Sequence, residues 1–262
     1  MISELAYIGK GAKLGKNVTV EPFAYIADDV VIGDDCYIYA HATILDGTRM
    51  GNRNKIHQGA VLGTEPQDLK YKGDKTELII GDDNDIRENV VIARATNAGH
   101  ATSIGNNCHL MDGVHICHGA VLKDYVMVGL KSIIGGNCVI ESYNVLSNAV
   151  ILYENVHIGN WTLIGNWTLI LSGTRLRKDV PPYIMVKGNP ATYHGVNTVI
   201  LQKNMFQPMN DTTLRHVMNA YLILYHSNIS PQDAAIRIKS EIESCPEVEN
   251  IINFITNSKL IV

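Results

Sequence analysis

Two histidines stand three residues apart in the segment LMDGVHICHG, residues 110–119. An imidazole can exchange a proton near neutral pH because its unperturbed pKa, about 6.5, lies close to working pH. His115 and His118 are therefore candidates for general base catalysis, in which a side chain removes the proton of an attacking hydroxyl group. A lone histidine is more often a surface residue without a chemical role, and the residue types alone leave both readings open.

The cysteines add no metal or disulfide chemistry to these histidines. None of the five belongs to a CxxC pair, the spacing typical of zinc sites and redox motifs. We expect free thiols, no metal, no cofactor and a reducing compartment. The positions concerned are Cys36, Cys108, Cys117, Cys138 and Cys245.

Composition narrows the class of protein further. The 262 residues are 46% hydrophobic and 18% charged, with a formal net charge of −4. No Lys/Arg cluster indicates a nucleic-acid partner, and no apolar run approaches the roughly 20 residues that a membrane span needs. The opening MISELAYIGK lacks the basic-then-apolar order of a secretory signal. We expect a cytoplasmic protein with no nucleic acid partner and no membrane span.

The elements that must position the histidines repeat every six residues. Ile, Leu, Val or Met falls on one phase at every sixth position from 2 to 62, at 80, 86 and 92, and from 104 to 176. A hexad is a short strand plus a tight corner, and three hexads close one triangular coil. A β-sandwich would not hold one phase for this long. The pattern predicts an all-β, left-handed parallel β-helix, a hexapeptide-repeat prism, over residues 1–190.

Two stretches interrupt the repeat without losing its phase. Residues 64–79 are polar and replace most of a coil, and residues 95–103 do so more briefly. Both are expected to be loops outside the prism, where binding residues tend to lie.

A second domain is expected over residues 191–262. Pro181 and Pro182 end strand geometry, and from about residue 198 the apolar residues follow helical spacing. This predicts a small α-helical C-terminal domain, with Ser230 or Asn228 capping the helix that begins at Pro231.

Several segments resemble one enzyme family along the whole chain. In order they read MIS-LAYI, PQDLKY, IGDDNDIREN, LMDGVHICHG, DVPPYI, GVN, NAYLILYHS and PEVENIINFI. Together they are similar to the acyl-carrier-protein:UDP-N-acetylglucosamine O-acyltransferases of lipid A biosynthesis. The resemblance implies transfer of a 3-hydroxyacyl group from acyl carrier protein to the 3-hydroxyl of UDP-N-acetylglucosamine, the first step of that pathway. It also implies a homotrimer with no metal and no covalent intermediate.

The resemblance assigns roles to individual residues. His118 matches the base and His115 a residue that lines the sugar pocket, while the N–H of Gly136 matches a donor to the oxyanion. Asp68 and Lys70 match sugar contacts on a loop, across a subunit boundary.

Two further residues of the C-terminal part are implied as nucleotide or carrier contacts. Asn197, in GVN, matches a contact to the nucleotide. Lys203 is the cation that remains in QKNMF, where the family has a more basic segment.

The chain departs from the family pattern around the expected site. Gly119 replaces an acidic residue able to orient the base, and Asn137 replaces a histidine after the oxyanion glycine. Tyr153 and Glu154 occupy the place of a His-Gln pair, so a carboxylate stands where the nucleotide diphosphate is expected. The prediction is a slower rate and repulsion of the diphosphate.

The segment GNWTLIGNWTLI, residues 159–170, makes the chain one hexad longer than the family pattern. One hexad is a third of a coil. Either the extra hexad leaves the coil as a bulge or loop, or everything after it turns by about 120° around the prism axis.

The departures leave three functions open. The leading interpretation is the acyltransferase itself. A catalytically impaired trimer that serves as a binding or regulatory scaffold is the alternative from another class. An acyltransferase for a different nucleotide sugar is the third.

Overall fold

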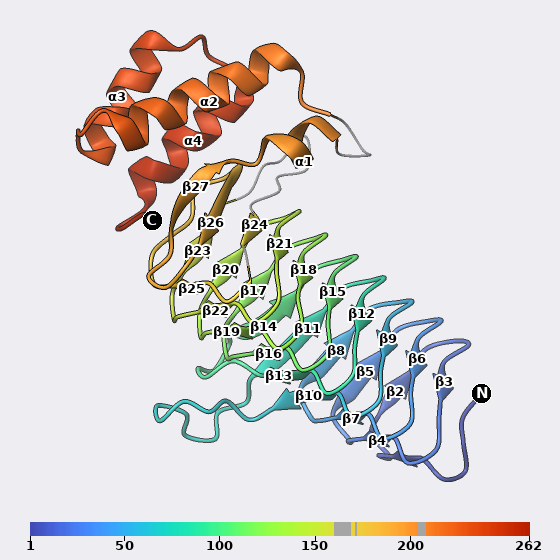
Figure 1. Ribbon diagram of the computed structural model, residues 1–262. Coiled ribbons are helices and arrows are strands. Elements are labelled where there is room, and N and C mark those ends of the chain that lie inside the picture. Colours follow the sequence, from blue (N-terminus) through green and yellow to red (C-terminus); the bar gives the residue numbers. More distant parts are fainter. Residues whose placement is uncertain (160–168, 171, 204–207) are drawn as a thin grey trace.

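The structure is a computed structural model that describes residues 1–159, 169–170, 172–203 and 208–262. Short parallel strands stack as three sheets that form the sides of a prism, and helices lie at the end remote from the N-terminus (Figure 1). This confirms the predicted parallel β-helix followed by a helical segment.

Each hexad contributes one short strand to one side of the prism. The first sheet contains β1 (Tyr7–Ile8), β4 (Tyr25–Ile26), β7 (Thr43–Ile44), β10 (Val61–Thr64), β13 (Val91–Ala93), β16 (His115–Ile116), β19 (Ile133–Ile134), β22 (Ile151–Leu152) and β25 (Arg175–Leu176). The second contains β2 (Lys13–Leu14), β5 (Val30–Ile32), β8 (Thr48–Met50), β11 (Glu77–Ile80), β14 (Ala101–Ile104), β17 (Val121–Leu122), β20 (Val139–Ile140) and β23 (His157–Ile158). The third contains β3 (Thr19–Val20), β6 (Tyr37–Ile38), β9 (Lys55–Ile56), β12 (Asp85–Ile86), β15 (His109–Leu110), β18 (Met127–Val128), β21 (Val145–Leu146), β24 (Leu169–Ile170), β26 (Ile184–Lys187) and β27 (Thr192–Val196).

The aliphatic residue of each hexad points into the prism. Ile26, Ile38 and Ile44 are completely buried, because alternate strand residues face opposite sides of a sheet. Successive coils pair at a spacing of three hexads, as Ile8 does with Ile26. The single hydrophobic phase in the sequence is therefore the core of the molecule.

Two loops leave the prism at the corner between the first and second sheets. One joins β10 to β11 across residues 65–76, and it stands away from the coils in Figure 1; the other joins β13 to β14 across residues 94–100. They lengthen the coil from three hexads to five between Val61 and Val91, and to four between Val91 and His115. Both predicted loops are confirmed, and both open beside His118.

The extra hexad does not rotate the rest of the prism. His157 pairs with Val139 at the usual spacing of three hexads, whereas Leu169 pairs with Val145, four hexads earlier. Leu169 begins β24 in the third sheet, the side on which the next strand belongs. The additional hexad therefore falls between His157 and Leu169, and the coil resumes its frame. Residues 160–168 of the repeated segment lie outside the described residues.

Four helices follow the prism: α1 (Thr198–Lys203), α2 (Asp211–His226), α3 (Pro231–Glu241) and α4 (Pro246–Asn257). Ser230 is the N-cap of α3, because its Oγ accepts a hydrogen bond from the N–H of Asp233 at 3.1 Å. The predicted domain boundary at residue 190 falls within a hairpin. Strand β27 pairs antiparallel with β26 and covers the last parallel strand, so the helical part begins at Thr198 rather than at 191.

The DVPPY segment joins the prism to the helices. Tyr183 and Tyr221 are both fully buried, and the Tyr221 hydroxyl donates to the carbonyl of Pro182 at 2.5 Å. Asn250 of α4 donates to the Tyr183 hydroxyl at 3.3 Å. Within the described ranges, no helix is both long and apolar enough to cross a membrane.

Candidate active site

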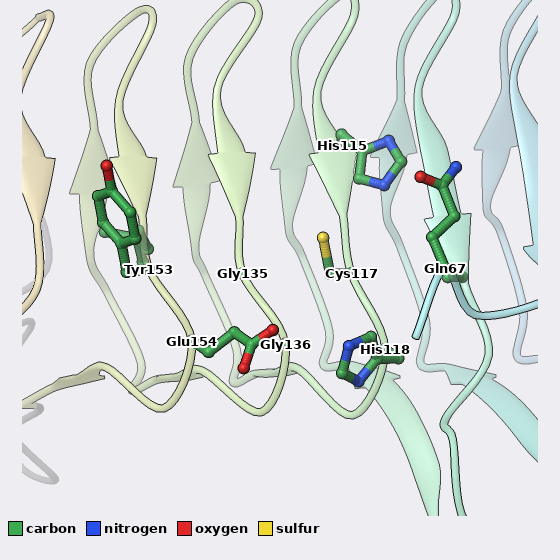
Figure 2. Close-up of a pocket in the computed structure, with 10 residues that line it drawn as sticks. Gln67, His115, Cys117, His118, Gly135, Gly136, Tyr153 and Glu154 are labelled. Atoms are coloured by element: carbon green, nitrogen blue, oxygen red, sulfur yellow. The ribbon is translucent and has the colours of Figure 1, made fainter. Parts of the chain in front are cut away.

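His118 lies at a corner of the prism, immediately after β16. Ile116 points inward and is completely buried, so the strand alternation turns His115 and Cys117 outward on the first sheet. His118 is 8% exposed. Figure 2 shows its ring at the turn, below Cys117 and His115. The HICH segment therefore presents two imidazoles to one side of the prism, with His118 held more tightly.

Gly136, one coil further along the prism, lies directly against the His118 ring. A Cβ atom added at Gly136 would overlap Cε1 of His118 and would lie 2.7 Å from its Nε2. Only glycine allows this approach. The N–H of Gly136 has no hydrogen-bond acceptor among the described residues. A free backbone donor thus stands beside the candidate base.

Asp68 reaches His118 from the loop after β10. Its Oδ2 atom lies 3.8 Å from Nε2 of His118, longer than a hydrogen bond and short enough for an ionic contact once the ring is protonated. Asp68 reaches the histidine of its own chain, whereas the contact to the sugar across a subunit boundary that the resemblance implies stays a prediction. The long insertion at 65–76 is what allows the loop to fold back along the corner.

Two loop contacts hold the Asp68 carboxylate. The N–H of Lys70 donates to Oδ1 at 3.0 Å, and the hydroxyl of Thr96, from the second loop, donates to Oδ2 at 2.9 Å. These hydrogen bonds, that of Lys70 foremost, and the nearby His118 lower the pKa of Asp68 below its usual value. The carboxylate is therefore a fixed negative charge beside His118. It lies near the ring although the residue that follows His118 in the chain, Gly119, has no acidic side chain.

His118 separates two hollows. The first, about 250 Å³, is lined by His115, Cys117, Gly136 and Glu154 among others. The second, about 220 Å³, lies over the loops and includes Asp68, Lys70, Asn137 and His118 itself. The imidazole borders both spaces, so two reactants can meet at it.

Gly119 and Asn137 form a structural pair. Gly119 has a φ of +66°, in the left-handed region that favours glycine, and an added Cβ would overlap Oδ1 of Asn137. The same arrangement recurs at Gly59, φ +70°, which faces Oδ1 of Asn89. The two departures from the family pattern are thus coupled, since the amide of Asn137 fills the space beside Gly119.

The far side of the first hollow carries the Glu154 carboxylate, and Arg177 lies beyond it, over Tyr153. Burial raises the pKa of Cys117, and the Glu154 carboxylate on the same wall adds to that effect. Burial also lowers the pKa of His115, which favours its neutral form. Next to Glu154, Tyr153 carries Arg177 above its ring, with the guanidinium carbon 4.2 Å from the ring centroid.

These groups are suited to acyl transfer. A base beside a fixed carboxylate can take a hydroxyl proton, and a free N–H can bind an oxyanion that develops on a carbonyl. Among the residues that the structure describes, no group of three or more His, Cys, Asp or Glu side chains is arranged to hold a metal ion.

Known proteins share this architecture and sequence. The repeats at residues 11–46 and 29–64 match the bacterial transferase hexapeptide family, and residues 179–261 match the second domain of UDP-N-acetylglucosamine O-acyltransferase. An acyl-[acyl-carrier-protein]–UDP-N-acetylglucosamine O-acyltransferase of Syntrophobacter fumaroxidans is 33% identical over 98% of this chain and 97% of its own length. The chain belongs to this acyltransferase family. A relative with the same name from Chlamydia caviae is 36% identical over 98% of this chain and 88% of its own.

Solved structures agree with this assignment. The UDP-N-acetylglucosamine acyltransferase of Bacteroides fragilis has a TM-score of 0.94 and 40% identity, covering 100% of this chain and 99% of its own. The family resemblance stated from the sequence is confirmed.

The structure does not bring every predicted acyltransferase residue together within one chain. Asn197 is 2% exposed at the junction of β27 and α1, and it lines neither hollow beside His118. Lys203 is the last residue of α1, and its side chain lies outside the described part of the chain. Both remain predictions. Thr96 and Arg177 were not singled out from the sequence, although Thr96 falls in a predicted loop and Arg177 lies just before the DVPPY segment.

Proposed function

We propose that this chain transfers a 3-hydroxyacyl group from acyl carrier protein to the 3-hydroxyl of UDP-N-acetylglucosamine, the first step of lipid A biosynthesis. The observation that carries the proposal is the packing of His118 against Gly136, with the Asp68 carboxylate also beside the ring. The names of the relatives supply the substrates.

In this reaction His118 is the general base. Nε2 takes the proton of the sugar hydroxyl as the oxygen attacks the thioester carbonyl carbon. The imidazolium that forms lies beside the Asp68 carboxylate, with Nε2 3.8 Å from Oδ2, so the carboxylate stabilises its positive charge.

The N–H of Gly136 serves the other half of the transition state. It donates to the carbonyl oxygen as negative charge develops there. When the carbon–sulfur bond breaks, the sulfur of the carrier's prosthetic group leaves with the proton returned by His118. A new ester bond and a free thiol are the products, so no other reactant is consumed.

The sugar is expected to lie between the two hollows. His115 lines the first, and Asp68 and Lys70 line the second, so the matched sugar contacts surround His118. Asn197 and Lys203 are assigned to the nucleotide or carrier site by the resemblance alone, and in the homotrimer that it implies a neighbouring subunit could supply them. The reducing cytoplasm suits five unpaired cysteines.

The test is acyl transfer from a panel of 3-hydroxyacyl carrier proteins to UDP-N-acetylglucosamine, run with wild type and His118→Ala. Loss of a general base lowers kcat by about 10²- to 10⁴-fold. Turnover that survives His118→Ala would refute the assigned base.

A non-catalytic scaffold remains the second candidate because Glu154 places a carboxylate in the first hollow. If Glu154 repels a bound diphosphate, Glu154→Gln should tighten binding of UDP-N-acetylglucosamine measured by calorimetry. If wild type transfers none of the acyl groups in the panel but still binds the nucleotide sugar, the scaffold is favoured.

A further inference from the structure

Three cations crowd the end of the first sheet, two coils beyond Gly136. Arg175, Arg177 and Lys178 line a hollow of about 130 Å³, which is completed by Asn189, Pro190, Ala191 and Val262. In the described ranges, no Asp or Glu carboxylate lies within 4.0 Å of any of the three. The three side chains are exposed, so water screens their repulsion, and an anion entering the hollow would be attracted by all of them.

Arg177 is held in place by Tyr153. Its guanidinium lies over the Tyr153 ring at 4.2 Å, and Nη2 donates to the phenol oxygen at 3.2 Å. Arg177 foremost, with Arg175, lowers the pKa of Tyr153. A planar guanidinium stacked on an aromatic ring is pre-organised, and its remaining N–H groups form the fork that suits phosphate oxygens.

Tyr153 connects these cations to the candidate active site. It lines the same hollow as His118 and Gly136, and Figure 2 shows it at the end of that hollow opposite Gln67. Cys117, Gly135, Tyr153 and Arg177 occupy equivalent places on successive coils. Since coils stack about 4.8 Å apart, Arg177 lies about 14 Å along the prism from the His118 coil.

The extra hexad is responsible for this contact. With an ordinary coil of three hexads, the neighbour of Tyr153 would be residue 171. Because Ile151 pairs with Arg175 at a spacing of four hexads, the residue above Tyr153 is Arg177.

We propose that Arg177, positioned by Tyr153 and assisted by Arg175, binds a phosphate group of a substrate that extends along the first hollow from His118. This proposal rests on the proposed function, in which both substrates carry phosphate esters: the diphosphate of the nucleotide sugar and the phosphate of the carrier's prosthetic arm. The chemistry is the same for both, and the experiment distinguishes them.

The kinetic test varies one substrate while the other is saturating. Loss of a charge-assisted hydrogen bond in Arg177→Gln should raise one KM about tenfold and change kcat by less than about twofold. A raised KM for UDP-N-acetylglucosamine assigns the nucleotide diphosphate, whereas a raised KM for the acyl carrier protein assigns the prosthetic phosphate. Arg177→Lys should recover part of the loss. Both KM values unchanged would overturn the proposal.

A binding test does not depend on turnover. Inorganic pyrophosphate and inorganic phosphate should raise the melting temperature of wild type, and this shift should be reduced in Arg177→Gln and in Tyr153→Leu. Lys16→Gln, which removes one exposed positive charge near the opposite end of the prism, is the matched control and should behave as wild type.

The two tests separate the possible failures. One outcome is that wild type turns over while Arg177→Gln changes neither KM value nor the rise in melting temperature caused by the anions. In that case the phosphate site is wrong and the proposed acyl transfer is unaffected. If wild type is silent but pyrophosphate stabilises it through Arg177, the site stands and the proposed reaction is wrong. If pyrophosphate or phosphate raises the melting temperature of wild type and of Arg177→Gln by the same amount, the phosphate site is wrong, whether or not the protein turns over.

Discussion

At the scale of single residues, the base and its carboxylate come from distant parts of the chain. Asp68 and His118 meet across two loops, and the hydrogen bonds to Asp68 come from Lys70 in one loop and Thr96 in the other. The departure at Gly119 therefore does not leave the imidazole without a negative charge nearby. We regard Asp68 as the residue that stabilises the imidazolium of His118.

Asp68→Asn should lower kcat. The amide keeps the shape of the carboxylate but not its charge, so the imidazolium that forms in the transition state loses its electrostatic partner. The expected loss is about 10- to 100-fold in kcat. Steady-state kinetics of Asp68→Asn measures this loss in kcat. Asp74→Asn, a change in the same loop that touches no site residue, is the control. Equal rates in the two variants would contradict this role.

Asp68 should also give stability a pH dependence. Its folded pKa is lowered below the unfolded value of about 3.9. The contribution to stability is therefore fully present above that value and is lost as pH falls through the lowered folded pKa. Urea unfolding of wild type and Asp68→Asn should differ at pH 7 and converge at acid pH. A difference that grows on acidification would contradict the assignment.

At the scale of elements, the corner turns decide which side chains are permitted. A side chain at residue 119 would have to adopt the positive φ of Gly119 and displace the amide of Asn137. An acidic residue directly after the base would therefore cost stability at this corner.

Gly119→Asp should destabilise the chain by about 1 to 3 kcal/mol, because a side chain in the left-handed region meets the Asn137 amide. The double variant with Asn137→Gly should recover part of that loss, since the two sites are in contact. Urea midpoints of the single and double variants provide the measurement.

Gly59→Asp is the matched control, because Gly59 has the same conformation against Asn89 and lies on another corner of the prism. It should lose similar stability. Additive effects of Gly119→Asp and Asn137→Gly would show that the pair is not coupled.

At the scale of the whole molecule, the single chain leaves apolar side chains on its prism faces. Tyr7, Tyr25, Val31, Ile79 and Ile133 are all more than a third exposed. Exposed apolar surface of this kind marks interaction sites, and closed symmetric oligomers are the usual way to bury it.

Light scattering should therefore return three times the 28.8 kDa of one chain. Replacing Ile79 with Lys on one such face should shift the mass toward the monomer, and it should also lower activity if the site draws residues from a neighbouring subunit. Lys16→Gln should keep the trimer. A wild-type mass of one chain with full turnover would exclude the trimeric site.

The sequence by itself determined the fold, because a hydrophobic phase of six is compatible with stacked three-sided coils and with little else. It also determined the position of His118 at a corner after β16, and of Gly136 one coil later, since both follow from counting hexads. The family motifs then identified the chemistry.

Only the tertiary structure decided which residues complete the site. Counting hexads gives a residue its coil and its side, but an insertion changes the residue that lies above it and a loop can fold in many directions. Asp68 meets His118 because an insertion of two hexads turns back along the corner. Arg177 meets Tyr153 because one additional hexad lengthens the coil between Ile151 and Arg175. These contacts depend on loop conformation and coil register, neither of which is encoded in the periodic pattern.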